Sequence, residues 1–443
     1  MKMQKLNNAL TLILATLLLC VAAIYNGYPL VFPDTGGYIG LNDNYFRSFF
    51  YNLFLAPALW AHTLWLVVVL QSLIVAHLLR LVLRAVFGLT SPLALLGVII
   101  PLCLLSNLPW FTGFIMPDIF TGVLILTLFL LVFCLPQLGS GEKIYIIALA
   151  VVAAMVHLSH IPLALGLLGT AWLFKMVMRK QHLLPSPALW RATIAVALAI
   201  VILLANNYRT YGILTISPGG YAFPLARLLA DGPAVRYLRA HCPEKNYALC
   251  AYLDQLPADS ITFLWSADSP FRKVGWIYGY RQEGQKIVVE TVLHYPFQIG
   301  KLSIWNTLRQ LPMINNRYIY SSLDTPHPTD AIKAYFPDEF GAYTSSRQSQ
   351  NTLDLRDFNL LHLLFIALCL PLAAATLFFY LKRRRFLPLL LLSALAGAYG
   401  LNAFITGALS EPNNRYGSRL IWLLPFFCLA AALDLIHNRR RQM

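Results

Sequence analysis

The stretch Asn26–His62, NGYPLVFPDTGGYIGLNDNYFRSFFYNLFLAPALWAH, lies between the first two apolar segments of the chain. It contains Asp34, one of only six acidic residues outside a large polar insert at 207–357. The run Pro33-Asp34-Thr35-Gly36-Gly37 favours a sharp bend. A charged carboxylate on a tight turn beside a bilayer is energetically costly and contributes little to the fold, so we interpret Asp34 as a candidate catalytic group.

Composition defines the class of protein. The chain has 443 residues, of which 58% are hydrophobic and 12% are charged, whereas soluble domains are about 45–50% apolar. A membrane helix needs about 20 apolar residues to cross about 30 Å of hydrocarbon. The sequence therefore predicts an α-helical polytopic membrane protein with ten spans, at roughly 7–25, 64–86, 91–107, 118–136, 143–158, 161–178, 189–206, 359–381, 386–406 and 418–437. Seven spans fall in residues 1–206, three fall in 358–443, and 207–357 is the α-rich soluble domain.

Basic residues predict the orientation of these spans, because cytoplasmic loops are enriched in Lys and Arg. With both termini in the cytoplasm, 16 of the 19 basic residues outside the insert lie at cytoplasmic helix ends. We therefore expect a multi-pass protein of the bacterial inner membrane with a periplasmic insert. The net charge of +15 is mainly this topology signal and does not indicate nucleic-acid binding. Arg47, Arg415 and Arg419 are the exceptions, which makes them candidate functional residues.

Arg415 and Arg419 open the last apolar segment and are four residues apart, so they share one helical face. A guanidinium fork matches phosphate oxygens, and a helix N-terminus adds partial positive charge. This pattern indicates a phosphate or pyrophosphate clamp. An internal salt bridge to Glu411 or Asp34 is the alternative.

Asp118 follows Pro117 at the start of the fourth segment. It could be a helix N-cap, or a second carboxylate level with Asp34 that positions an acceptor or holds a divalent metal. Arg47 lies in an aromatic run typical of a helix in the headgroup layer. It would either snorkel to the interface or meet a phosphate.

His157 and His160 are spaced at i, i+3 and flank the shortest loop on the periplasmic side. Both rings can face one side of a helix. This pair has three interpretations: polar packing between helices, contact with a phosphate or sugar, and metal binding. Two histidines alone are weak evidence for a metal site.

The insert holds Cys242 and Cys250, the only two of seven cysteines outside the apolar segments. We predict a disulfide between them, since the periplasm permits oxidation. Residues 287–311 predict an amphipathic helix that could rest on the bilayer surface. The insert has no nucleotide-binding loop, nucleophile elbow or zinc-finger spacing, so we interpret it as a lid or acceptor-binding module.

In layout the chain resembles the GT-C superfamily, integral-membrane glycosyltransferases that use polyprenyl-phosphate-linked sugars. The resemblance is carried by Asp34 after the first span, Asp118 at a later span, the large insert, and the pair Arg415-Tyr416 opening a late helix. It implies that Asp34 is the catalytic base and Asp118 a companion acid. It also implies that the donor phosphate meets Arg47, Arg415 and Arg419.

These observations predict a sugar transferase that acts on the outer face of the inner membrane, among membrane lipids, with a glycan, lipid or protein as acceptor. No cofactor is certain and a divalent metal is an open alternative. The expected substrate contacts are Tyr38, His157, His160, Glu411 and Tyr416. The competing hypotheses are a flippase, polymerase or ligase of surface polysaccharide, and a non-enzymatic envelope assembly protein.

Overall fold

The computed structural model describes residues 2–40, 45–177, 186–319, 323 and 326–442, and every regular element in this part is a helix. The nearest approach to a sheet there is one isolated parallel bridge between Leu30 and Phe114. The predicted α-helical class is therefore confirmed for the described residues.

Among the described residues, seven helical segments are long and apolar enough to cross a membrane, which indicates a multi-pass membrane protein. In the first half of the chain they are α4 (Trp65–Phe87), Ile119–Gln137 comprising α7 (Ile119–Phe129), η2 (Leu130–Cys134) and η3 (Leu135–Gln137), α9 (His160–Val177), and most of α10 (Ser186–Tyr211). In the second half they are α20 (Arg356–Lys382), α21 (Phe386–Leu409), and Asn414–Asn438 from α22 (Asn414–Ile421) and α23 (Leu423–Gln442).

The other three predicted spans correspond to helices outside this set of seven: α1 (Lys2–Leu19), α5 (Pro92–Leu105) and α8 (Ser140–Met155). The 14 residues of α5 extend about 21 Å at 1.5 Å per residue, which is less than the hydrocarbon thickness. The apolar part of α1 is Leu6–Leu19, after which α2 (Val21–Asn26) begins a new helix. Ten crossings therefore stay a prediction.

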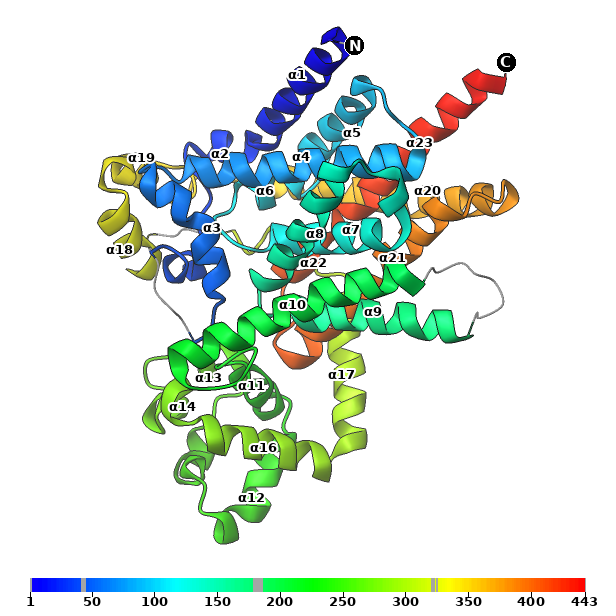
Figure 1. Cartoon of the computed structure of the whole chain (residues 1–443). Helices are drawn as coiled ribbons and strands as arrows, with labels where there is room; N and C mark the ends of the chain where they lie inside the picture. Colours follow the sequence, from blue (N-terminus) through cyan, green and yellow to red (C-terminus); the bar gives the residue numbers. More distant parts are fainter. Residues whose placement is uncertain (1, 41–44, 178–185, 320–322, 324–325, 443) are drawn as a thin grey trace.

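These short helices are integral to the bundle. Helix α1 packs against α4 and α5, and α8 packs against α7 and α10. Ile119–Gln137 is the most enclosed span, with 89% of its apolar window buried. Figure 1 shows α7 at the centre of the assembly of apolar helices. The N-terminus of this central helix is the position of Asp118.

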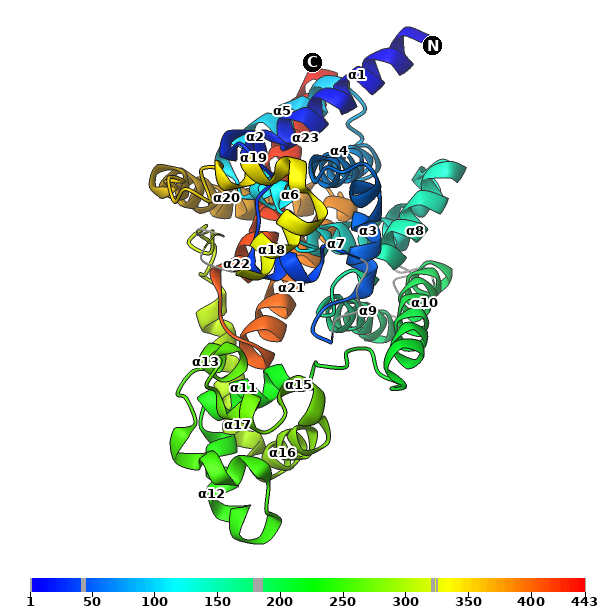
Figure 2. The same cartoon turned by 90° about the vertical axis from the view of Figure 1, so that its left-hand side faces the viewer.

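The first part of the insert forms a separate helical unit, which lies to one side of the apolar helices in both views (Figures 1 and 2). Its own hydrophobic core includes Leu225, Tyr237, Phe263, Phe271 and Ile287. The helices of this unit are α11 (Ala222–Ala230), α12 (Pro233–Lys245), η5 (Ala248–Gln255), α13 (Ser260–Trp265), α14 (Pro270–Lys273), α15 (Trp276–Gly279) and α16 (Arg281–His294). Helix α17 (Pro296–Gln310) follows α16 and packs mainly against α21.

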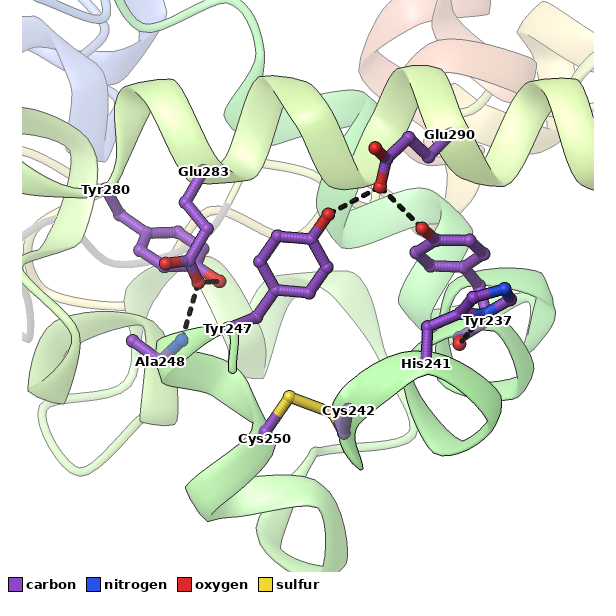
Figure 3. The surroundings of a disulfide bond; sticks show 9 residues. All are labelled: Tyr237, His241, Cys242, Tyr247, Ala248, Cys250, Tyr280, Glu283 and Glu290. Atoms are coloured by element: carbon purple, nitrogen blue, oxygen red, sulfur yellow. Dashed lines mark hydrogen bonds between the residues drawn. A yellow bond between two sulfur atoms is a disulfide. The ribbon is translucent and has the colours of Figure 1, made fainter. Parts of the chain in front are cut away.

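The predicted disulfide between Cys242 and Cys250 is confirmed. It joins α12 to η5, and Figure 3 shows Tyr237 and Tyr247 between this bond and Glu290 of α16. Glu290 accepts hydrogen bonds from the hydroxyls of Tyr237 and Tyr247, each at 2.5 Å. The disulfide therefore closes the loop that holds Tyr247 against Glu290.

The remainder of the insert returns to the apolar helices. It comprises α18 (Pro326–Tyr335), η6 (Pro337–Glu339) and α19 (Phe340–Thr344), and α18 packs on the short helix η1 (Pro33–Gly37). The carboxylate of Glu339 accepts hydrogen bonds from Tyr28 at 2.9 Å and Thr63 at 2.5 Å. Ile332, Phe336 and Tyr343 accordingly belong to the main core rather than to the separate unit.

Candidate functional site

Three separate parts of the chain contribute charged side chains to one cluster. Asp34 lies on η1, and Arg47 lies just before α3 (Phe49–Trp60). Asp118 immediately precedes α7, and α22 carries both Arg415 and Arg419. The sequence predicted these five residues as the site, and the structure brings all five together.

Arg415 is the centre of the cluster because it contacts both carboxylates. Its Nη1 donates to Asp34 at 3.1 Å, while Nε and Nη2 donate to Asp118 at 3.1 and 3.0 Å. Arg47 donates to the other oxygen of Asp34 at 2.6 Å. Arg419 reaches Asp118 at 3.4 Å. The internal ion pair between Arg415 and Asp34, considered as an alternative from sequence, is therefore present.

The side chains of the cluster differ in how exposed they are to solvent. The side chains of Arg419, Asp118 and Arg415 are 1%, 2% and 9% exposed, whereas that of Asp34 is 30% exposed. Asp34 is thus the carboxylate that an incoming molecule can reach. Burial raises the pKa of Asp34, but the charges of Arg47 and Arg415 outweigh this effect and lower the pKa to about 2.

Backbone pairing fixes the relative positions of the two aspartates. The Leu30 N–H donates to the carbonyl of Gly113, and the Ile115 N–H donates to the carbonyl of Leu30, both at 2.9 Å. Thr35, next to Asp34, donates its hydroxyl to the carbonyl of Ile115 at 3.1 Å. The segment before Asp118 is therefore tied directly to the turn that carries Asp34.

Polar side chains on α21 and at the start of α22 orient the arginines. Asn413 caps α22 by accepting a hydrogen bond from the Arg415 N–H at 3.0 Å. Asn402 accepts from Arg419 at 2.6 Å and donates to the carbonyl of Tyr416 at 2.9 Å. Asn402 was not among the predicted site residues. The feature of the sequence that could have identified it is a polar amide side chain in an otherwise apolar span.

Aromatic rings surround the guanidinium groups. Arg415 lies 4.4 Å from the ring centre of Phe32, and the ring of Tyr416 lies 5.7 Å from Arg415 and 5.2 Å from Arg419. Arg47 lies 5.8 Å from the ring of Tyr38. The predicted contacts Tyr38 and Tyr416 are thus at the cluster, and cation–π attraction helps to hold the arginines in place.

The two histidines differ in their relation to the cluster. His157 lies 2.8 Å from the hydroxyl of Ser159, to which Arg419 donates at 3.4 Å. His160 is fully buried, with its ring nitrogens 2.9 Å from Thr121 and 2.5 Å from the carbonyl of Ala153. The rings of the two histidines stack at 5.0 Å. His157 therefore borders the cluster, while His160 has polar partners within the helix bundle.

Glu411 takes part in a different contact. Its carboxylate accepts a hydrogen bond from Ser260 at 2.6 Å, which ties the loop before α22 to α13 of the separate unit. Glu411 therefore contacts the insert. The acidic partners of the arginines are Asp34 and Asp118.

The charged residues do not fit a divalent metal. Within the described ranges, no group of three His, Cys, Asp or Glu side chains is arranged to hold a metal ion. The carboxylates of Asp34 and Asp118 are both occupied by guanidinium groups. A metal would therefore have to displace arginines, and we derive no step through one.

The arrangement is suited to an anion instead. Three guanidinium groups share two carboxylates, so the cluster carries one excess positive charge. The Nε of Arg419 is also buried without a hydrogen-bond partner among the described residues. A buried positive charge and a free donor favour an additional anionic ligand.

No protein-family model, curated protein or solved structure matches the chain. The functional argument therefore depends on the residues of the chain itself.

Proposed function

We propose that this chain is an inverting membrane glycosyltransferase that moves a sugar from a polyprenyl-phosphate donor to an acceptor. The observation that carries the proposal is the cluster of three arginines on two aspartates at the ends of apolar helices. A polyprenyl-phosphate sugar has its tail in the bilayer and its phosphate at the interface. Arg47, Arg415 and Arg419 would bind that phosphate, because guanidinium forks match phosphate oxygens.

The chemistry follows from the charges. An acceptor hydroxyl attacks the anomeric carbon, its proton passes to Asp34, and the bond from the sugar to the phosphate breaks. The polyprenyl phosphate leaves with the electron pair, and the arginines stabilise its growing negative charge. Asp34 is assigned as the base because it is the more exposed carboxylate. The buried Asp118 holds Arg415 and Arg419 in position.

The low pKa of Asp34 has a mechanistic consequence. A carboxylate with a pKa of about 2 is a weak base while Arg47 and Arg415 remain paired to it. A bound phosphate competes for the same guanidinium groups, so the pKa of Asp34 rises when the donor enters. Asp34 would thus become an effective base only in the presence of the donor.

The proposed topology places this reaction on the periplasmic face of a bacterial inner membrane. It includes α1, α5 and α8 as spans alongside the seven longer segments, giving ten crossings, a periplasmic insert and cytoplasmic termini. Reporter fusions test this topology. Alkaline phosphatase fused after residue 255 should be active, and the same reporter fused to the C-terminus should be inactive. The reverse result would refute the orientation.

A transfer assay tests the activity. Purified protein in lipid vesicles is given polyprenyl-phosphate-linked sugars and the envelope fraction of a deletion strain. Mass spectrometry of that strain shows which decoration is missing, and this identifies the acceptor. Asp34→Asn should reduce turnover by about 10² or more with no loss of folded protein. The matched control is Asp354→Asn, an exposed residue paired to Arg356. Full activity in Asp34→Asn would exclude Asp34 as the base.

A further inference from the structure

Helix α17 has an apolar side that no other part of the described chain covers. Phe297 is 93% exposed, and Ile304, Trp305 and Leu308 are 63%, 59% and 53% exposed. These positions repeat at helical spacing on one face. The opposite face holds Asn306 and Gln310, which are buried. Val289, Val292 and Leu293, near the end of α16, are exposed as well.

The sequence predicted one amphipathic helix over 287–311, but the structure has two, α16 and α17, which meet at Tyr295. Pro296 explains the break, since proline cannot continue the preceding helix and is favoured at a helix start. The break lets α17 leave the separate unit and run back to α21 (Figure 1).

Two contacts with the membrane span α21 show how deep α17 lies. The hydroxyl of Tyr399 donates to the carbonyl of Leu311, directly after α17, at 2.7 Å. Tyr399 is ten residues before Leu409, the end of α21, which corresponds to about 15 Å along the helix. Asn306 packs against Gly407 near that end. The last turns of α17 therefore lie level with the apolar length of a span.

We infer that the exposed face of α17 is embedded among the lipid acyl chains of the leaflet on the side of the insert. Leu308 lies within the depth range set by the contacts of Asn306 and Leu311, and Ile304 and Trp305 lie within one helical turn of Asn306 on the side nearer the end of α21. If this face were in contact with water, its apolar side chains would be hydrated at a depth where the neighbouring span α21 is apolar. The exposed Lys301 and Arg309 flank them and can extend toward lipid phosphates. The insert is thus anchored to the bilayer through α17, whatever reaction the chain performs.

Site-directed spin labelling of the full chain in vesicles of phosphatidylcholine and phosphatidylglycerol tests this inference. Separate Ile304→Cys, Leu308→Cys and Phe297→Cys proteins carry a nitroxide. Asp268→Cys, at an exposed position elsewhere in the insert, is the aqueous control. The five natural free thiols are buried, and the unsubstituted protein measures any background labelling. Oxygen collides preferentially with lipid-embedded nitroxides, and a water-soluble nickel chelate collides with hydrated ones.

Lipid embedding predicts an oxygen-to-nickel collision ratio at 304 and 308 that is roughly fivefold or more above that at 268. Phe297, at the other end of α17, should give an intermediate ratio. A ratio at 304 and 308 equal to that at 268 would place the face in water and overturn the inference. Protection from both reagents would mean that protein covers the face, which also overturns it. Phe297 is almost fully exposed, so its replacement gives a folded protein even if the other two variants are damaged.

Discussion

Asp118 accepts two hydrogen bonds from Arg415, at 3.1 and 3.0 Å, although the two residues are 297 positions apart in the chain. The same guanidinium group also reaches Asp34. One side chain near the C-terminal end therefore joins the turn after α2 to the start of α7. The geometry of the whole cluster depends on the fork shape of this arginine.

Replacement of Arg415 should affect both stability and activity. Arg415→Ala leaves Asp118, which is 2% exposed, with only its longer contact to Arg419, and breaking a buried pair costs about 3–5 kcal/mol. Arg415→Lys keeps the charge but loses the paired hydrogen bonds, so we expect transfer to fall by about 10² or more. Thermal unfolding in detergent and the transfer assay measure these effects. Arg356→Ala, which removes an exposed pair, should change neither, and an equal effect there would contradict the prediction.

The stability contributed by Asp34 should depend on pH. The pKa of Asp34 in the folded chain is about 2, below that of an unfolded aspartate, so its ion pairs stabilise the folded state above about pH 4. This contribution is lost as the pH falls through the folded pKa. Wild type should unfold at a higher temperature than Asp34→Asn at about pH 6, and the difference should shrink toward about pH 2.5.

The control for this measurement is Asp268→Asn, an exposed residue outside the cluster, which should follow wild type at every pH. A difference between wild type and Asp34→Asn that stays constant down to low pH would show that the ion pairs of Asp34 do not stabilise the fold.

Removal of the disulfide should loosen the separate unit. The bond closes a separation of eight residues, for which the chain-entropy estimate is about 2.5 kcal/mol. We expect the pair Cys242→Ser with Cys250→Ser to expose α12 and η5 to limited proteolysis. A reducing agent should have the same effect on wild type but none on the double variant. Sensitivity of the double variant to the reducing agent would point to another cause.

Gly417 should be required for the position of α22. A Cβ atom there would collide with the backbone carbonyl of Met313, whereas one at Gly400 would meet nothing within 4 Å. Gly417→Ala should therefore displace Arg415 and Arg419 and lower both transfer activity and the unfolding temperature. Gly400→Ala, on α21, should be close to neutral. Unchanged unfolding and activity in Gly417→Ala would show that the segment around Met313 can move away at little cost.

The sequence was most informative where charge is scarce. Asp34, Asp118, Arg415 and Arg419 could be selected because an ionisable group beside a membrane span is costly and needs a reason. The disulfide could be predicted because two cysteines stood apart from the apolar segments. Neither inference required knowledge of the packing.

Packing partners were beyond this reasoning. Asn402 is an amide in an otherwise apolar span, but the sequence does not reveal that it accepts a hydrogen bond from Arg419. Ile332 and Tyr343 appeared to belong to one soluble insert, but they are buried in the main core, since polar composition does not reveal which surface a segment returns to. The C-terminal ends of the first and third spans were placed too late, at 25 and 107 instead of Leu19 and Leu105, because hydropathy continues past the points where α1 and α5 end.

The long separation between Asp118 and Arg415 also bears on biosynthesis. A ribosome that adds about 5–20 residues per second needs about 15–60 seconds to proceed from one to the other. During that interval the nascent polypeptide has both acidic groups in place with neither of their partners from α22. A product that terminates before Asn414 would keep Asp118 without either guanidinium group, so only a chain synthesised past that helix can neutralise it.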